Sequence, residues 1–173
     1  MNARRYSLIL LALVLAGFLV RAYAATDNFW LDEVFTYYLA LDLDSPLDAL
    51  TKVRTDHHIL NTMMMRMLGD RTEWVWYRLF SVFTGAASLL LMILAARRHS
   101  EREALFAALL ASLSFPLIVY SSEARGYAPA IFFSLAAWQL LEADNRHPTW
   151  PRLLAFWSCS ALAVSSPEPG WAR

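Results

Sequence analysis

The chain has 173 residues, of which 58% are hydrophobic and 17% charged, and its 15 basic side chains balance its 15 acidic ones. A soluble domain has roughly 45–50% apolar residues, so this composition argues against an ordinary soluble protein. The zero net charge gives no indication of a nucleic-acid partner. A single cysteine, Cys159, excludes a disulfide framework and a cysteine-based zinc site.

The hydrophobic residues fall into uncharged blocks, which are residues 6–20, 79–96, 104–122, 126–141 and 153–167. A membrane-spanning helix needs roughly 17–25 predominantly apolar residues, and long polar side chains at its ends can reach the water. The sequence therefore predicts an all-α, polytopic transmembrane protein that forms a single region over residues 1–173. The expected spans are about 6–25, 78–96, 104–121, 126–142 and 153–167.

Basic residues border these blocks on one side of the expected membrane. They are Arg4, Arg5, Arg97, Arg98, Arg102, Arg146 and Arg152. By the positive-inside rule these residues and the N-terminus are cytoplasmic, so the loop 26–77 and the link 121–126 are external. The loop carries nine acidic residues against four basic ones, which agrees with that orientation.

The first block has a second interpretation. "MNARR", the apolar stretch and "AYA" at residues 22–24 are also typical of a signal peptide with its cleavage site. Arg21, directly before that site, is unusual for such a peptide. The later spans favour a permanent anchor, and cleavage stays open as the alternative.

Local signals predict amphipathic surface helices in the external loop and a bend in the third span. Ser45 followed by Pro46 is typical of a helix start. A second helix is expected over "HHILNTMMMRML", ended by Gly69 in the position of a left-handed C-cap. Pro116 lies inside the third expected span and predicts a bend near its outer end.

Adjacent carboxylates, Asp32 and Glu33, open the external loop. On a helix their side chains diverge by about 100°, so one can face a reacting group while the other binds a cation or a base. The alternative is a simple helix start, where carboxylates favour the helix dipole.

Two further polar stretches lie on the same side. "DHHILN", residues 56–61, contains metal-ligand types that could hold a divalent ion with Asp32 or Glu33, although the spacing alone favours a solvated helix start. "SSEARGYA", residues 121–128, places Arg125 at the rim of two spans. An arginine there needs an anion, either a phosphate or a carboxylate such as Glu123 or an acid of the outer loop.

With these stretches in this order along the chain, the sequence resembles the membrane-embedded glycosyltransferases of the GT-C superfamily. The resemblance is greatest to the branch that contains aminoarabinose-lipid A transferases and protein O-mannosyltransferases. The resemblance rests on Arg21, on "FWLDEVFTYYLA", on "DHHILNTMMMRMLGDRTEWVWYRLFSVFTG" and on "YSSEARGYA". It extends to about residue 160. The family commonly has prolines after the histidine, where His58 and Ile59 stand here.

The resemblance implies that a sugar passes from a polyisoprenyl-phosphate donor to a lipid, glycan or protein acceptor on the outer face of a bacterial inner membrane. It implies that Asp32 is the general base and that Glu33 orients it or helps to hold a cation. Arg125 with Glu123 would hold the donor phosphate, alone or with a divalent cation at Asp56 and His57.

Family members are much longer, with more spans and a soluble outer domain, so the chain is expected to be a partial GT-C fold. The last block is short and runs into "PEPG", residues 167–170, which breaks a helix. We therefore expect a truncated chain that is inactive by itself. A non-catalytic scaffold or subunit stays open, as does a transporter fragment, although transporters usually place charges inside their spans.

Overall fold

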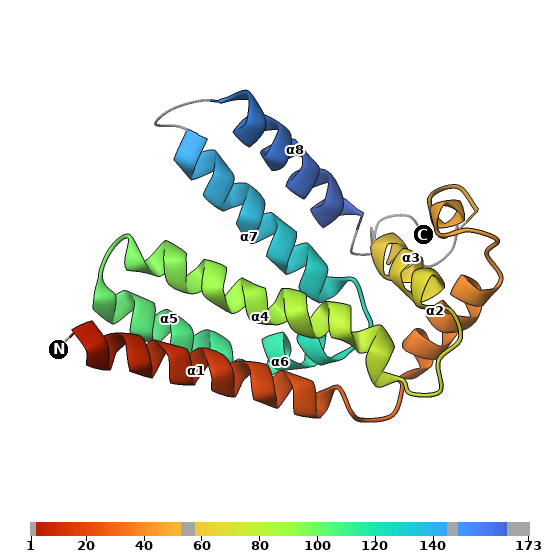
Figure 1. The fold of residues 1–173 in the computed structure, drawn as a ribbon, viewed down its shortest axis with the longest axis horizontal. Coiled ribbons are helices and arrows are strands. Elements are labelled where there is room, and N and C mark those ends of the chain that lie inside the picture. Colours follow the sequence, from red (N-terminus) through yellow and green to blue (C-terminus); the bar gives the residue numbers. More distant parts are fainter. Residues whose placement is uncertain (1–2, 53–57, 145–148, 166–173) are drawn as a thin grey trace.

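The computed structural model describes residues 3–52, 58–144 and 149–165, and every regular element within them is helical (Figure 1). The all-α prediction is confirmed. In chain order the elements are α1 (Ala3–Ala24), α2 (Leu31–Leu41), the 3₁₀ helix η1 (Pro46–Leu50), α3 (Ile59–Leu68), α4 (Val75–Arg97), α5 (Glu101–Leu113), α6 (Phe115–Ser122), α7 (Tyr127–Asp144) and α8 (Trp150–Val164).

Among the described residues, two helices are long and apolar enough to cross a membrane, namely Arg4–Ala24 within α1 and the whole of α4. A third crossing follows if α5 and α6, which meet at 58°, form one broken span. The expected spans 126–142 and 153–167 fold as α7 and α8, but neither is both long and apolar enough. The 15 residues of α8 rise about 22 Å, which is short of a hydrocarbon core of about 30 Å.

The break between α5 and α6 comes from Pro116, as the sequence predicts. Proline has no N–H, so it cannot bond the Ser112 carbonyl four residues earlier, and its ring clashes with that turn. Ser114 takes an extended conformation between the two helices. The chain therefore changes direction close to the end of the bundle at which α1 finishes (Figure 1).

Helices α1, α4 and α5 pack against one another, and α7 packs on α4 and pairs with α8 (Figure 1). The closest approach between α4 and α6 occurs at Gly85, where an added Cβ would collide with the Ser121 side chain. Glycine at this position allows the broken span to lie directly against α4.

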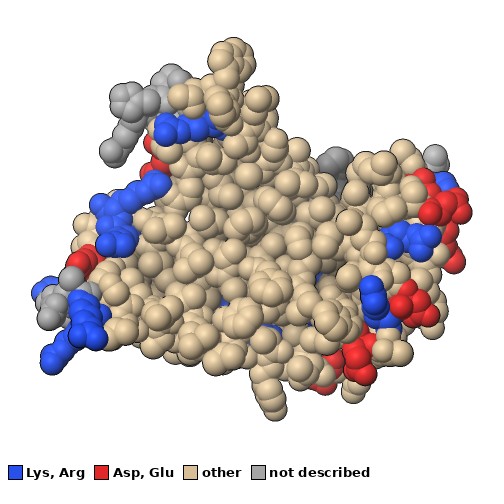
Figure 2. Space-filling view, in the orientation of Figure 1, with Lys and Arg blue, Asp and Glu red and all other residues tan. Residues whose placement is uncertain are grey.

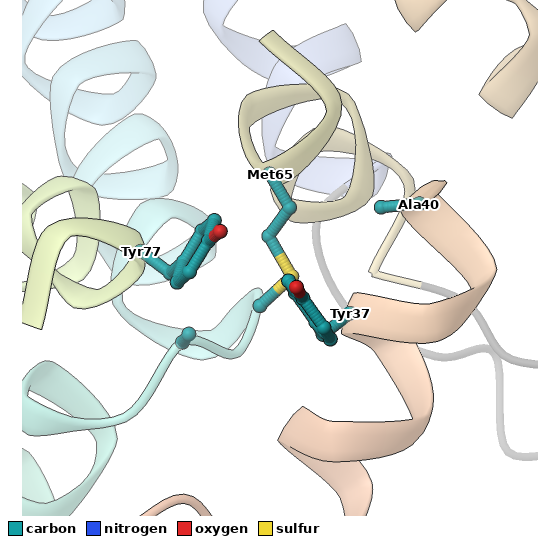
Figure 3. Close-up of a cluster of buried hydrophobic side chains, with 5 residues drawn as sticks. Tyr37, Ala40, Met65 and Tyr77 are labelled. Atoms are coloured by element: carbon teal, nitrogen blue, oxygen red, sulfur yellow. The ribbon is translucent and has the colours of Figure 1, made fainter. Parts of the chain in front are cut away.

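Helices α2, α3 and η1 gather at the end of the bundle where α4 begins (Figure 1). A buried cluster joins them to α4 and to the α6–α7 link, and Figure 3 shows Tyr37, Ala40, Met65 and Tyr77 within it. The Tyr37 hydroxyl donates to Asp70 Oδ1 at 2.7 Å. The surface helices are therefore fixed to the bundle by aromatic packing with satisfied hydroxyls.

Two predicted helix boundaries in this region are confirmed, the start after Ser45 and the end before Gly69, whereas α3 begins at Ile59, two residues after the start of the expected helix. η1 begins at Pro46, directly after Ser45, whose N–H donates to Asp48 Oδ2 at 3.0 Å. α3 ends before Gly69, which has a positive φ of 65°, although its ψ of −163° lies outside the left-handed helical conformation expected for the cap. Both boundaries follow from local chemistry, which is why the sequence reveals them.

Charge is distributed unevenly over the molecule. In Figure 2, lysines and arginines gather mainly at the end where α1 begins, and acidic residues gather at the end formed by α2 and α3. Between the two ends this face is almost free of charge.

Candidate functional site

A buried ion pair joins the first turn of α2 to the first turn of α4. The Glu33 side chain is fully buried, and Arg78 is 1% exposed. Arg78 Nε donates to Glu33 Oε1 at 2.9 Å and Nη2 donates to Oε2 at 2.6 Å. This bidentate geometry matches the planar guanidinium to the carboxylate, the strongest arrangement available to such a pair.

The remaining donors of Arg78 bind the link between α1 and α2. Nη1 donates to the carbonyls of Ala25 at 3.1 Å and Asp27 at 2.6 Å, and Nη2 donates to the carbonyl of Asn28 at 2.8 Å. The Phe29 ring lies 5.1 Å from the guanidinium carbon. The link is therefore wrapped around one buried cation, and all five N–H groups of that cation are used.

Glu33 is saturated as well. Besides Arg78, its Oε2 accepts the N–H of Trp30 at 2.9 Å and its Oε1 accepts the N–H of Ala124 at 2.5 Å. The Trp30 bond caps the start of α2, and the Ala124 bond reaches the α6–α7 link. A carboxylate that is fully buried and bonded in this way leaves no face for a metal cation.

Asp32 has the opposite environment, although it is the neighbouring residue. Its side chain is 63% exposed, and its Oδ2 lies 2.9 Å from Arg125 Nη2. Arg125 also faces Glu123, whose Oε2 lies 3.2 Å from Arg125 Nε without a hydrogen-bonding alignment. The predicted alternative for Arg125, an ion pair with Glu123 and an acid of the outer loop, is therefore present in the structure.

Glu123 is largely buried beside this pair, with 7% of the residue exposed. Burial raises the pKa of its carboxyl, and the positive charge of Arg125 offsets only part of that rise. The site thus contains one carboxylate open to water and one whose charged form is disfavoured, on either side of a single arginine.

A cavity of about 670 Å³ opens next to these residues, between the end of α1, the α1–α2 link, α4 and α6. Its walls combine aromatic side chains such as Tyr23, Trp30 and Phe115 with the polar groups of Asp27 and Glu123. Asp32 and Arg125 are not among its lining residues. The cavity therefore reaches the ion pair through Glu123, which lines the cavity and also contacts Arg125.

The described residues of the "DHHILN" stretch contact the α6–α7 link and the start of α7. Asn61 is fully buried and donates to the carbonyl of Ala124, and the His58 ring lies 5.2 Å from the Tyr127 ring. Asp56 and His57, the residues expected to hold a cation, lie outside the described residues. Within the described ranges, no group of three or more His, Cys, Asp or Glu side chains has a metal-binding arrangement.

Arg21, which the sequence identifies only as part of a motif, is fully buried at the break of the third crossing. It donates to the carbonyls of Gly17 at 2.9 Å, Ala111 at 3.0 Å and Ser112 at 3.5 Å. The last two belong to the final turn of α5, where Pro116 ends the hydrogen-bond ladder. A cation is also favoured at a helix C-terminus.

Sequence reasoning gave neither Arg21 nor Arg78 a separate role. The available signal is an arginine close to or inside an otherwise uncharged block, because such a charge is buried only when it has partners.

Comparison of the chain with protein-family models, curated proteins and solved structures gives no match.

Proposed function

We propose that the chain forms the outer-face reaction site of a membrane glycosyltransferase that uses a polyisoprenyl-phosphate sugar. The observation that carries the proposal is the pair of Asp32 and Arg125, which lies at the outer end of apolar helices beside a large cavity. The sequence resemblance to GT-C enzymes points to the same two residues.

The two neighbouring acids divide their roles. Glu33 and Arg78 hold α2, α4 and the α6–α7 link together, so the fold does not depend on Asp32. Asp32 is 63% exposed, and an ion pair with so exposed a partner contributes only about 0–1 kcal/mol to stability, so stabilisation of the fold is a weak reason for the Asp32–Arg125 pair. The Asp32 side chain is therefore available to a ligand, and a phosphate could reach Arg125 through the 21% of its side chain that is exposed.

In the proposed reaction an acceptor hydroxyl attacks the anomeric carbon of the sugar. A bond forms between the acceptor oxygen and that carbon while the bond from the carbon to the phosphate oxygen breaks. Asp32 takes the hydroxyl proton as general base, and Arg125 stabilises the negative charge on the departing polyisoprenyl phosphate. Glu33 positions Asp32 from the same helical turn, and Glu123 orients Arg125.

A divalent cation at Asp56 and His57 belongs to the same proposal. Of the two carboxylates considered as further ligands, only Asp32 faces water, because Glu33 is buried and saturated. A bound cation would add positive charge near the phosphate.

The proposed orientation places the N-terminus and the arginine-rich end in the cytoplasm of a bacterial cell, within a polytopic partial GT-C fold in the inner membrane. The concentration of arginines at one end and of acids at the other supports this orientation (Figure 2). A lipid-linked donor then reaches the site from within the membrane, and the acceptor arrives from outside.

The test is sugar transfer by the full chain reconstituted in lipid with a panel of polyisoprenyl-phosphate sugars. Asp32→Asn should lower turnover about 10²–10⁴-fold while donor binding persists. Arg125→Lys should weaken donor binding, because an ammonium cannot make the bidentate contact. Asp42→Asn changes another exposed acid at the end of α2 and serves as the control.

Two outcomes would count against the proposal. Near-normal turnover in Asp32→Asn would remove Asp32 as the base. Absence of transfer with every donor agrees with the expected inactivity of the chain by itself, and donor binding then decides: no binding of any polyisoprenyl-phosphate sugar, or equal binding by wild type and Arg125→Lys, would remove the function. In the second case a non-catalytic membrane scaffold is favoured, because Arg125 already has carboxylate partners on both sides without a ligand.

A further inference from the structure

A second cavity lies at the opposite end of the bundle from the Asp32 site. It is a groove of about 340 Å³ along the contact between α1 and α5. Its lining is apolar apart from one arginine and consists of Ile9, Leu13, Arg102, Leu105, Phe106 and Leu109. Ile9 and Leu13 are one turn apart, as are Leu105 and Leu109, so the groove follows both helices.

The charged end of the groove is where α5 begins. Arg102 precedes Phe106 by one turn, its side chain is exposed, and within the described residues its guanidinium has no hydrogen-bond or ion-pair partner. The nearby carboxylate of Glu103 accepts a hydrogen bond from Ser100 Oγ at 3.0 Å. The head of the groove therefore presents a guanidinium that has no ion-pair partner among the described residues, although the exposed carboxylates of Glu101 and Glu103 flank it in the chain.

Two other arginines lie close to the same end. Arg97 stands over the Tyr6 ring, with its guanidinium carbon 5.9 Å from the ring centre, and Tyr6 packs against Ala104 of α5. Arg5 is exposed one turn before Ile9 on α1. An anion at Arg102 would thus have Arg5 and Arg97 at the same end of the bundle.

We infer that this groove binds an anionic phospholipid, with one acyl chain along α1 and α5 and the lipid phosphate on Arg102. Basic pockets between membrane helices are typical sites for anionic headgroups. The guanidinium can bind two phosphate oxygens at once. The groove lies apart from the proposed transfer site. The inference therefore does not depend on which reaction the protein catalyses.

The groove is better suited to an acyl chain than to another helix. Helices that pack in membranes use small residues at their contact surface. Here the Phe106 side chain projects from the wall, with 65% of the residue exposed. A flexible chain can bend around that ring, whereas a rigid helix cannot.

The experiment measures lipid binding to the purified full chain by native mass spectrometry, with dioleoyl phosphatidylglycerol and dioleoyl phosphatidylcholine as probes. Wild type should prefer the anionic lipid, and Arg102→Gln should lower its affinity about five-fold, which corresponds to about 1 kcal/mol per basic residue near an anionic surface. Arg102→Lys should keep most of the preference. Leu109→Trp should reduce binding by filling the groove, although Arg102 remains.

Arg98→Gln is the matched control, because it removes the same charge from the same end of the molecule. Arg98 faces Glu142 and the Trp138 ring instead of the groove, so its replacement should leave the lipid preference unchanged. Soluble glycerol phosphate should not compete, because it lacks acyl chains.

Three results of the binding measurements would overturn the inference. They are an equal affinity of wild type for both lipids, an unchanged preference in Arg102→Gln, and competition by glycerol phosphate, which would reveal a headgroup site without the groove. A dimer that excludes lipid would also overturn it, because a second copy would then cover the groove. The helical circular dichroism and the melting midpoint of each variant without lipid show whether it has folded.

Discussion

Replacing Glu33 with glutamine removes one buried charge while keeping almost the same shape. In the folded protein the carboxylate accepts hydrogen bonds from Arg78 Nε, Arg78 Nη2 and the N–H groups of Trp30 and Ala124. The amide group of glutamine would place its own N–H groups against two of these donors. Arg78 would then remain buried without its counter-charge.

Removing one partner of a buried ion pair costs about 3–5 kcal/mol. Arg78 also donates to the carbonyls of Ala25, Asp27 and Asn28, and these three dipoles still solvate the guanidinium in the variant. We therefore expect a loss near the lower limit, about 3 kcal/mol. Arg78→Met should cost more, because it leaves those three carbonyls without their donors and the Glu33 carboxylate buried without its counter-charge.

The double variant Glu33→Met/Arg78→Met tests whether this network responds to replacement as an isolated buried ion pair would. An isolated pair can often be replaced by apolar residues without loss of stability. Here the replacement would leave the backbone groups of Ala25, Asp27 and Ala124 without partners, each at a cost of about 1–3 kcal/mol. The double variant should therefore remain as unstable as Arg78→Met.

The measurement is unfolding by sodium dodecyl sulfate in mixed micelles, followed by far-ultraviolet circular dichroism. Asp42→Asn, which changes an exposed acid at the end of the same helix, should remain within about 0.5 kcal/mol of wild type. The reasoning is refuted if Glu33→Gln has nearly wild-type stability, or if the double variant recovers the stability that each single change removes.

Three further predictions use the same assay or a labelling experiment. Arg21→Met should cost about 1–3 kcal/mol for each α5 carbonyl that loses its donor, which the unfolding midpoint reports. Hydrogen bonding to a neighbouring carboxylate raises the pKa of Tyr37 to about 12. The unfolded chain releases that proton from about pH 10 while the folded chain keeps it, so stability should fall between pH 10 and about 12, and Tyr37→Phe should lack this part of the fall. Single cysteines at Ser45 and Ser100, with Cys159 replaced, should react with an impermeant reagent from opposite sides of the membrane, and labelling from one side would contradict the orientation.

Features set by local chemistry could be predicted from the sequence. Pro116 lacks a backbone N–H donor whatever the surrounding fold, so it interrupts the helix. Gly69 supplies the positive φ at which α3 ends. The hydrophobic blocks correctly indicate helices as well. Block length already marked the last block, which folds as α8, as short. It did not show that α7 is less suited to crossing a membrane, because polar residues within that helix lower its hydropathy.

The candidate site depends on contacts between distant residues. The sequence allowed Arg125 to pair with an acid of the outer loop, but the choice of Asp32 depends on how α2 is placed against the α6–α7 link, 93 positions later. It likewise could not tell which of the adjacent acids is buried. That depends on the rotation of α2, which the Arg78 guanidinium fixes by binding Glu33.

The exposure of Asp32 is therefore a consequence of the burial of Glu33. Successive side chains on a helix point about 100° apart, so a turn that directs Glu33 at Arg78 must direct Asp32 elsewhere. The N–H of Ala124, bonded to Glu33, and the guanidinium of Arg125, next along the chain, bring the α6–α7 link to both acids at once. A single buried pair thus sets the position of an exposed one. It follows that a change at Glu33 should disturb the Asp32–Arg125 contact, whereas a change at Asp32 should leave the Glu33 network intact.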